Sequence, residues 1–269
     1  MAGTILFAGI YGLYRILLSI LERVVLKTKP NGTDTPASVG LDFEDFHITS
    51  GNRQLQAWYV HAAPANDSKK AILIYHGVYE SISEWIHVMH YLWEHGIASM
   101  VFDYSGFGNS EGRATLAHLR EDALAAYRVF LSKTAPSSEK IALGYSLGTG
   151  VLLEAVRNFP DPLDGLILVG AFSSFRDVAV KVKALTPRLA FIMPDIYNNV
   201  QAIQHVKTPL LMIHSQDDQL FPLTMPSKIY ATANESKRLV VLKGLKHNDM
   251  LEGRAGEYLL SVVEYNFLL

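Results

Sequence analysis

Five short, continuously apolar runs, separated by helix-length segments, constrain the fold of this chain more than any other feature. They span residues 71–75, 98–102, 141–144, 166–169 and 210–213. Strands of a parallel sheet read this way because helices cover both faces of the sheet. Two earlier runs, 41–48 and 54–60, alternate polar and apolar residues as antiparallel edge strands do. With a further β-type run at 238–242, the sequence predicts an α/β protein with a mostly parallel eight-stranded sheet and helices on both faces.

The segments outside these runs suggest how the chain is divided. A length of 269 residues fits one domain of this class. We expect that domain to span residues 41–269. A polar, turn-rich linker at 29–40 would join it to an N-terminal apolar helix at 1–28. Between the runs at 166–169 and 210–213, residues 171–207 contain Pro187 and Pro194 and are expected to form a small cap over the carboxyl edge of the sheet.

Ser146 lies in the run Gly144-Tyr145-Ser146-Leu147-Gly148, between the apolar run 141–144 and a helical stretch. A strand, a sharp turn and a helix in this order present the serine hydroxyl at the carboxyl edge of the sheet. The alternative is a serine that only caps the helix. A nucleophilic serine needs a histidine base and a carboxylate that orients the base.

The chain supplies both partners in loops that follow strands. Asp217 and Asp218 follow the run 210–213, and His247 follows the run 238–242. The order Ser, Asp, His is typical of a nucleophile elbow on an open α/β sheet. The sequence therefore predicts a catalytic triad at one edge of the sheet.

These motifs, together with 73–77 and 102–112, resemble the α/β-hydrolase superfamily, in its abhydrolase-domain branch of Bem46-like and serine aminopeptidase S33-like proteins. The resemblance runs from about residue 41 to the C-terminus and implies the α/β-hydrolase fold. Its acid motif, aspartate followed by any residue, two aliphatics and proline, matches 218–222 with Phe221 at one aliphatic place. The resemblance therefore implies Asp218, rather than Asp217, as the triad acid.

Acyl transfer also needs preorganised donors for the oxyanion, and backbone amides serve this purpose. The amide of Leu147, directly after the nucleophile, is one candidate, and by resemblance the amide of Val78 is the other. Many relatives carry a small or polar residue where Val78 and Tyr79 stand, so Tyr79 is expected to shape the substrate pocket.

The cap could line an acyl-sized apolar pocket, and Phe172 and Met193 are its first candidates for substrate contact. The alternative is that these side chains pack the cap onto the body of the domain. The full set of apolar cap candidates is Phe172, Phe175, Leu185, Leu189, Phe191, Ile192, Met193 and Tyr197.

Other patterns in the sequence argue against sites for a dinucleotide, a metal ion or nucleic acid. Glu111 stands where the third glycine of a dinucleotide motif would lie. The chain has no cysteine, and its histidines at 87, 90 and 95 lack a completing carboxylate, so we expect no metal site and no cofactor. A formal charge of -2 gives no reason to expect nucleic acid as a partner. His76, Asp103 and His214 are expected to hydrogen-bond and pack rather than react.

Residues 5–26 are almost all apolar and could cross a bilayer of ~30 Å as a tilted helix. Arg15 weakens that interpretation, because a charge at mid-bilayer costs about 2.5–3.5 kcal/mol. The alternative is a helix whose small and polar stripe lies against lipid headgroups, against the domain or against a second copy of the chain. Arg23 lies near the end of the segment and Lys27 and Lys29 follow it, so a spanning helix would leave the domain on the cytoplasmic side. The polar stripe consists of Thr4, Ala8, Tyr11, Arg15, Ser19 and Glu22.

These patterns predict a membrane-associated serine hydrolase that acts on small-molecule or lipid carboxylic esters, with acyl or lysophospholipid-like substrates favoured by the anchor and the cap. A serine peptidase or amidase with the same triad is one alternative. A non-catalytic binding protein on the same scaffold is another.

Overall fold

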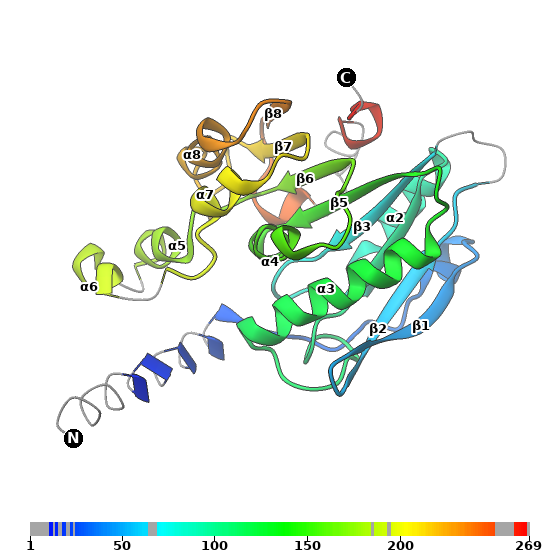
Figure 1. Ribbon diagram of the computed structural model, residues 1–269, viewed down its shortest axis with the longest axis horizontal. Helices are drawn as coiled ribbons and strands as arrows, with labels where there is room; N and C mark the ends of the chain where they lie inside the picture. Colours follow the sequence, from blue (N-terminus) through cyan, green and yellow to red (C-terminus); the bar gives the residue numbers. More distant parts are fainter. Residues whose placement is uncertain are drawn as a thin grey trace.

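An eight-stranded sheet forms the centre of the protein, in the strand order β1-β2-β4-β3-β5-β6-β7-β8 (Figure 1). β1 pairs with β2, and β2 with β4, in antiparallel register, whereas the other pairs are parallel. The computed structural model describes residues 11–12, 14–15, 18–19, 22–23, 25–63, 69–183, 186–192, 195–250 and 261–267. The strands are β1 (Glu44–Ser50), β2 (Arg53–Val60), β3 (Lys70–Tyr75), β4 (Ala98–Phe102), β5 (Glu139–Tyr145), β6 (Gly165–Val169), β7 (Leu210–Ser215) and β8 (Lys237–Leu242). The α/β-hydrolase architecture predicted from the sequence is confirmed.

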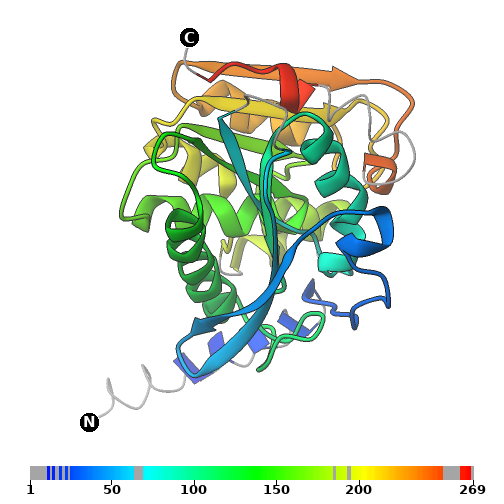
Figure 2. The same ribbon diagram turned by 90° about the vertical axis from the view of Figure 1, so that its right-hand side faces the viewer.

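Helices cover both faces of the sheet, and this explains why the inner strands are continuously apolar (Figures 1 and 2). In β3, Leu73 and Tyr75 belong to the core on the side of α3 (Leu116–Lys133), α4 (Leu147–Ala155) and α8 (Thr224–Thr232). Ile72 and Ile74 point the other way, into the core beneath α2 (Ile86–Glu94). Alternate residues of one strand therefore enter two different cores.

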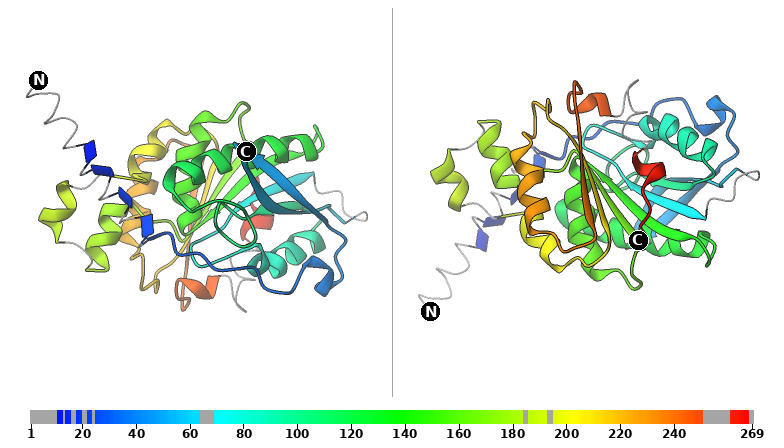
Figure 3. Two further views of the ribbon diagram at one scale, coloured as in Figure 1. Left: turned by 90° about the horizontal axis from the view of Figure 1, so that it is seen from below. Right: turned by 90° about the horizontal axis from the view of Figure 1, so that it is seen from above.

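The segment between β6 and β7 carries three short helices. They are α5 (Phe175–Lys181), α6 (Pro187–Ile192) and α7 (Asn199–Ala202). Figures 1 and 3 show α5 and α6 standing off from the body of the molecule, whereas α7 lies against it. The remaining short elements are the 3-10 turns η1 (Pro36–Val39), η2 (Ile82–Trp85), η3 (Val156–Asn158), η4 (Ile203–His205) and η5 (Asn248–Met250).

The described part of the N-terminal segment is attached to the hydrolase body. The Glu22 carboxylate accepts a hydrogen bond of 3.0 Å from the Leu116 amide, at the first turn of α3. Such a carboxylate satisfies a free amide and complements the positive end of the helix dipole. Leu26 is buried in the core beside α3, and the Lys27 carbonyl accepts from the Tyr79 amide at 3.0 Å.

The predicted apolar helix of residues 5–26 falls largely outside the described residues, which in this stretch are 11–12, 14–15, 18–19, 22–23 and 25–26. Over the whole part of the chain that the structure describes, no helix has the length and apolar character that crossing a bilayer requires.

Candidate active site

Ser146 occupies a sharp turn between the end of β5 and the start of α4. Its φ of 50° and ψ of -116° lie in a region that non-glycine residues rarely adopt. The flanking glycines make the turn possible. A Cβ atom on Gly148 would lie 1.9 Å from the Tyr75 carbonyl oxygen, and one on Gly144 would lie 2.7 Å from the Gly148 carbonyl oxygen. The turn therefore needs glycine at both positions, because a Cβ atom at either one would overlap backbone atoms of a neighbouring segment.

The three residues of the predicted triad meet at this turn. His247 Nε2 lies 2.9 Å from Ser146 Oγ, and His247 Nδ1 lies 2.7 Å from Asp218 Oδ2. Ser146 and Asp218 are each 5% exposed and His247 is 7% exposed. With the imidazole proton on Nδ1, the serine hydroxyl can donate to Nε2 while Nδ1–H donates to the carboxylate. This geometry suits removal of the serine proton during attack on a carbonyl.

Asp218 is fixed by its own loop. Its Oδ1 accepts hydrogen bonds of 2.8 Å from the amides of both Leu220 and Phe221. Burial raises the pKa of Asp218, but its hydrogen bond and charge interaction with His247 outweigh this, and the net pKa is lowered. Asp217, by contrast, is exposed and accepts from the Gly244 amide at 2.7 Å. The structure therefore places Asp218, not Asp217, against the imidazole.

His247 is held from two sides by aromatic rings. The Tyr145 hydroxyl donates to the His247 carbonyl at 2.8 Å, and the two rings stack with centroids 5.6 Å apart. The Phe221 ring meets the imidazole edge-on at 4.7 Å. These contacts restrict the imidazole to the plane in which it reaches both Ser146 and Asp218.

The loop after β3 carries the predicted oxyanion donor Val78, and it lies close to the start of α4. The close approach of Gly148 to the Tyr75 carbonyl brings the two segments together. Within the described part of the chain, neither the Val78 amide nor the Leu147 amide donates a hydrogen bond. The role of these two amides as oxyanion donors stays a prediction.

Glu80 is a residue at this loop that sequence reasoning missed. Its side chain is buried, and its Oε2 accepts from the Gly77 amide at 2.7 Å and from Trp85 Nε1 at 3.2 Å. Burial raises the pKa of Glu80 to about 8. The available signal was a carboxylate three residues after Gly77, the glycine in the loop that follows β3. Its contacts fix the peptide that leads into Val78.

His76 and Asp103 lie below the same loop and contact backbone, as predicted. His76 Nδ1 lies 2.8 Å from the Gly77 carbonyl oxygen, and the Ile82 amide donates to Asp103 Oδ1 at 2.9 Å. Burial lowers the pKa of His76 to about 4 and raises that of Asp103 to about 7. His214 Nε2 likewise lies 2.8 Å from the Phe221 carbonyl oxygen, where it supports the Asp218 loop.

The predicted substrate-contact residues are placed differently from one another. Phe172 is buried and packs on Phe221, with ring centroids 5.4 Å apart, so it belongs to the aromatic wall that ends at His247. Tyr79 is 59% exposed on the loop after β3. Met193 and Leu185 lie outside the described residues.

Two apolar residues of the predicted pocket lining are exposed. Leu189 is 51% exposed and Phe191 is 77% exposed. Both lie on α6, which stands off from the body of the molecule (Figure 1). Their place in an acyl pocket therefore stays a prediction.

No group of three or more His, Cys, Asp or Glu side chains in the described ranges is arranged to hold a metal ion.

The sequence was compared with protein families and with known proteins. The sequence model of the family described as "Serine aminopeptidase, S33" matches residues 66–202. The chain is 28% identical to the uncharacterized protein YfhR of Escherichia coli over 218 residues, which cover 79% of this chain and 75% of that protein. It is 28% identical to an uncharacterized membrane protein of Saccharomyces cerevisiae over 227 residues, 82% of this chain and 79% of that protein.

A third relative has a described activity. The lysophosphatidylserine lipase ABHD12 of Danio rerio is 31% identical over 159 residues, 54% of this chain and 41% of that protein. Among solved structures, the esterase Pf2001 of Pyrococcus furiosus superimposes with a TM-score of 0.71 at 20% identity, covering 90% of this chain and 98% of that one. At this sequence identity, the structural similarity shows that the two proteins share a fold.

Proposed function

The chain belongs to the serine aminopeptidase S33 family of α/β-hydrolases, and from that premise we propose that it is a serine hydrolase that cleaves carboxylic esters through an acyl-enzyme. In this proposal Ser146 is the nucleophile, His247 the general base and Asp218 the residue that orients the imidazole. The observation that carries the proposal is the unbroken contact from Ser146 Oγ through His247 to Asp218, at 2.9 and 2.7 Å.

The mechanism follows from these contacts. His247 Nε2 takes the proton of Ser146 as Oγ attacks the acyl carbonyl carbon. The amides of Val78 and Leu147 stabilise the negative charge that develops on the carbonyl oxygen. The imidazolium then protonates the leaving alcohol, and the same base activates the water that hydrolyses the acyl-enzyme. The carboxylate of Asp218 stabilises the imidazolium throughout.

Acyl or lysophospholipid-like esters are the proposed substrates. Two features support this choice: the aromatic wall of Phe172 and Phe221 beside His247, and the similarity to a lysophosphatidylserine lipase. An apolar wall beside the nucleophile suits an acyl chain.

We further propose that residues 5–26 associate with a membrane, with residues 29–40 as a linker and 41–269 as the catalytic domain. The membrane-protein description of the yeast relative supports this. The basic residues that follow the segment favour a catalytic domain on the cytoplasmic side.

A serine peptidase is the second candidate, and the description of the matched family favours it. A substrate panel separates the two: p-nitrophenyl esters of increasing acyl length, lysophospholipids and aminoacyl amides. The proposal predicts ester cleavage that is lost in Ser146→Ala and kept in Ser227→Ala, a matched serine on the exposed side of α8. Preferential cleavage of the amides would replace the esterase proposal with the peptidase. A folded wild type that cleaves nothing would favour a binding protein.

A further inference from the structure

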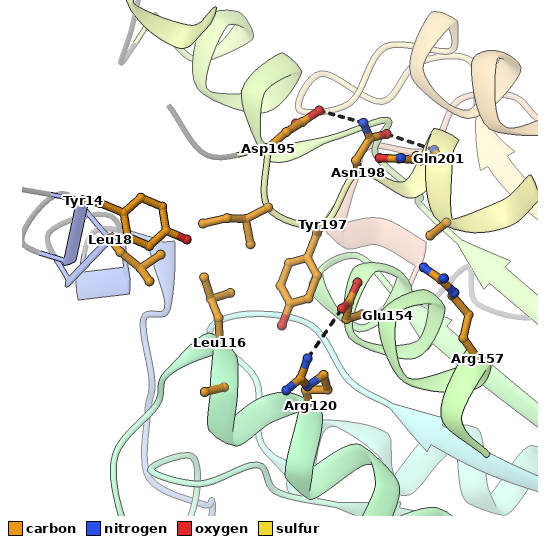
Figure 4. A pocket seen from close by; sticks show the side chains of 13 residues that line it. Tyr14, Leu18, Leu116, Arg120, Glu154, Arg157, Asp195, Tyr197, Asn198 and Gln201 are labelled. Carbon is orange, nitrogen blue, oxygen red and sulfur yellow. Dashed lines mark hydrogen bonds and ion pairs between the residues drawn. The ribbon is translucent and has the colours of Figure 1, made fainter. Parts of the chain in front are cut away.

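A second hollow lies away from the triad, between the start of α3, the end of α4 and the segment 195–202 (Figure 4). Its volume is about 380 Å³, and Tyr14 and Leu18 of the N-terminal segment form part of its wall. This volume suits a small organic molecule or the head of a larger one. None of the triad residues lines it.

Tyr197 supplies an unsatisfied donor in this cavity. Its side chain is 5% exposed, and its hydroxyl has no hydrogen-bond partner among the described residues. The ring is wedged against Gly150, where a Cβ atom would lie 3.0 Å from the Tyr197 Cγ atom, and against Phe175. In Figure 4 the hydroxyl points toward the side chains of Arg120 and Glu154. A buried hydroxyl without a partner is unusual in a native protein, and an acceptor atom of a ligand would satisfy it.

The cavity lining carries two arginines, Arg120 and Arg157, and two carboxylates, Glu154 and Asp195, so an anionic ligand would bind through the arginine donors rather than through a net positive charge. Asp195 Oδ2 accepts from Asn198 at 2.6 Å and lies 3.7 Å from Arg176, whereas Asp195 Oδ1 is buried without a hydrogen-bond partner among the described residues. Glu154 pairs with Arg120 only at 4.0 Å, which leaves guanidinium donors of Arg120 unused. Arg157 has no acidic partner within the described part of the chain. A phosphate oxygen is the acceptor that guanidinium groups bind most readily, often through two parallel hydrogen bonds.

The lining also includes several apolar side chains, which an apolar portion of the ligand would cover. Leu18, Leu116, Ile196 and Ala202 provide this surface. We propose that the cavity binds an amphiphile whose head carries a phosphate ester, with the phosphate against the Tyr197 hydroxyl and Arg120 and the apolar portion against Leu116 and Leu18. This site goes beyond the proposed ester hydrolysis, because it holds a ligand that the triad does not touch.

A row of aromatic rings connects this cavity with the triad. Tyr197 packs on Phe175 at 5.1 Å, Phe175 on Phe172 at 5.2 Å, and Phe172 on Phe221 at 5.4 Å. Phe221 in turn contacts His247. A ligand that fixes Tyr197 therefore restrains the wall of the proposed acyl pocket without entering it.

The first test measures binding by titration calorimetry with 1-O-octylglycerol 3-phosphate, an ether that a carboxylic ester hydrolase cannot cleave. Glycerol 3-phosphate represents the head alone and 1-O-octylglycerol the apolar portion alone. The proposal predicts saturable 1:1 binding of the whole probe, with each half at least about tenfold weaker. Protein whose Ser146 has first been blocked by a fluorophosphonate should bind the probe equally well.

Variants then locate the binding. Tyr197→Phe keeps the ring and removes the hydroxyl, and Arg120→Gln removes the cation. Each should weaken binding about tenfold, as expected for a hydrogen bond to a charged group. Arg128→Gln, an exposed arginine further along α3, is the matched control and should bind as the wild type does. Thermal melting checks that each variant is folded.

Three results would overturn the proposal. One is unchanged binding in both folded variants. Another is glycerol 3-phosphate binding as tightly as the whole probe, which would indicate a site for a free phosphate ester. The third is loss of binding after Ser146 is blocked, which would assign the probe to the triad pocket.

Discussion

Two regions of the molecule differ in how far their polar atoms find hydrogen-bond partners within the protein. One is the triad corner, formed by Ser146, His247 and Asp218, and the other is the cavity beside Tyr197. At the triad corner, Asp218 accepts from two amides and contacts His247, which in turn contacts Ser146. In the cavity, the Tyr197 hydroxyl has no partner among the described residues and the Arg120–Glu154 pair is loose. A network completed within the protein holds reacting groups in place before substrate arrives. A network left incomplete requires a partner from outside.

One helix connects the two regions. α4 begins directly after Ser146 with Leu147, the proposed oxyanion donor, and carries Glu154 of the cavity in its last turn. The two regions therefore share a rigid element, although only one of them carries the proposed chemistry. Variants that act on one region and spare the other can test how separate they are.

The largest expected effect is a difference in activity between substitutions of two adjacent aspartates, Asp218 and Asp217. Asp218→Asn should lower kcat for ester hydrolysis by about 10⁴-fold, because the imidazole loses the acceptor that fixes its tautomer. Asp217→Asn should change kcat by less than about twofold, since the exposed Asp217 carboxylate accepts from the Gly244 amide. Steady-state kinetics on a p-nitrophenyl ester measures both. Equal losses in the two variants would contradict the assignment of Asp218.

The next effect tests the close packing behind the elbow. Gly148→Ala should destabilise the protein by about 3 kcal/mol or more, because the new methyl would overlap the Tyr75 carbonyl oxygen. Gly32→Ala is the control: its nearest neighbour would be a Ser83 side-chain atom at an ordinary 3.5 Å. Urea unfolding followed by circular dichroism gives both values. A stable Gly148→Ala protein would mean that α4 and β3 lie further apart than described.

Glu80, on the loop after β3, should make the stability of the protein depend on pH. Its pKa of about 8 in the folded protein exceeds the ordinary value of 4.5, so between these pH values the folded state holds a proton that the unfolded state has released. Stability contributed by this group therefore falls as pH rises from 4.5 to 8, at most by about 1.4 kcal/mol per pH unit. Glu80→Gln should flatten this slope. Urea unfolding of wild type and variant at pH 5, 6.5 and 8 measures it, and parallel curves would count against a neutral Glu80.

The smallest effect compares the two regions directly through matched tyrosines. Tyr145→Phe leaves the buried His247 carbonyl without its donor and should cost about 1–3 kcal/mol of stability. Tyr197→Phe removes a hydroxyl that has no partner among the described residues, so stability should stay within about 0.5 kcal/mol or rise. Thermal and urea unfolding without ligand give both values. A larger loss for Tyr197→Phe would show that its hydroxyl is already satisfied within the protein.

Local patterns predicted much of the fold and the candidate site. The apolar runs identified the parallel strands because each one enters two cores. The order of Ser146, Asp218 and His247 predicted that they would meet, because loops after parallel strands share one edge of the sheet.

Features that depend on packing between distant segments were not predictable. Glu80 against Gly77, Glu22 at the start of α3 and the unpartnered Tyr197 each result from tertiary approach that no local pattern encodes. The exposure of Phe191 shows the same limit, since hydrophobicity alone does not say which side of a cap helix faces the body.

The most direct test of the account is the site of covalent labelling. Wild type, Ser146→Ala and Ser227→Ala proteins are treated with a fluorophosphonate, and the modified peptide is identified by tandem mass spectrometry. The account predicts a single adduct on Ser146 in wild type and in Ser227→Ala, and none in Ser146→Ala. An adduct on another serine, or a folded wild type that stays unlabelled, would contradict the claim that Ser146 is an activated nucleophile.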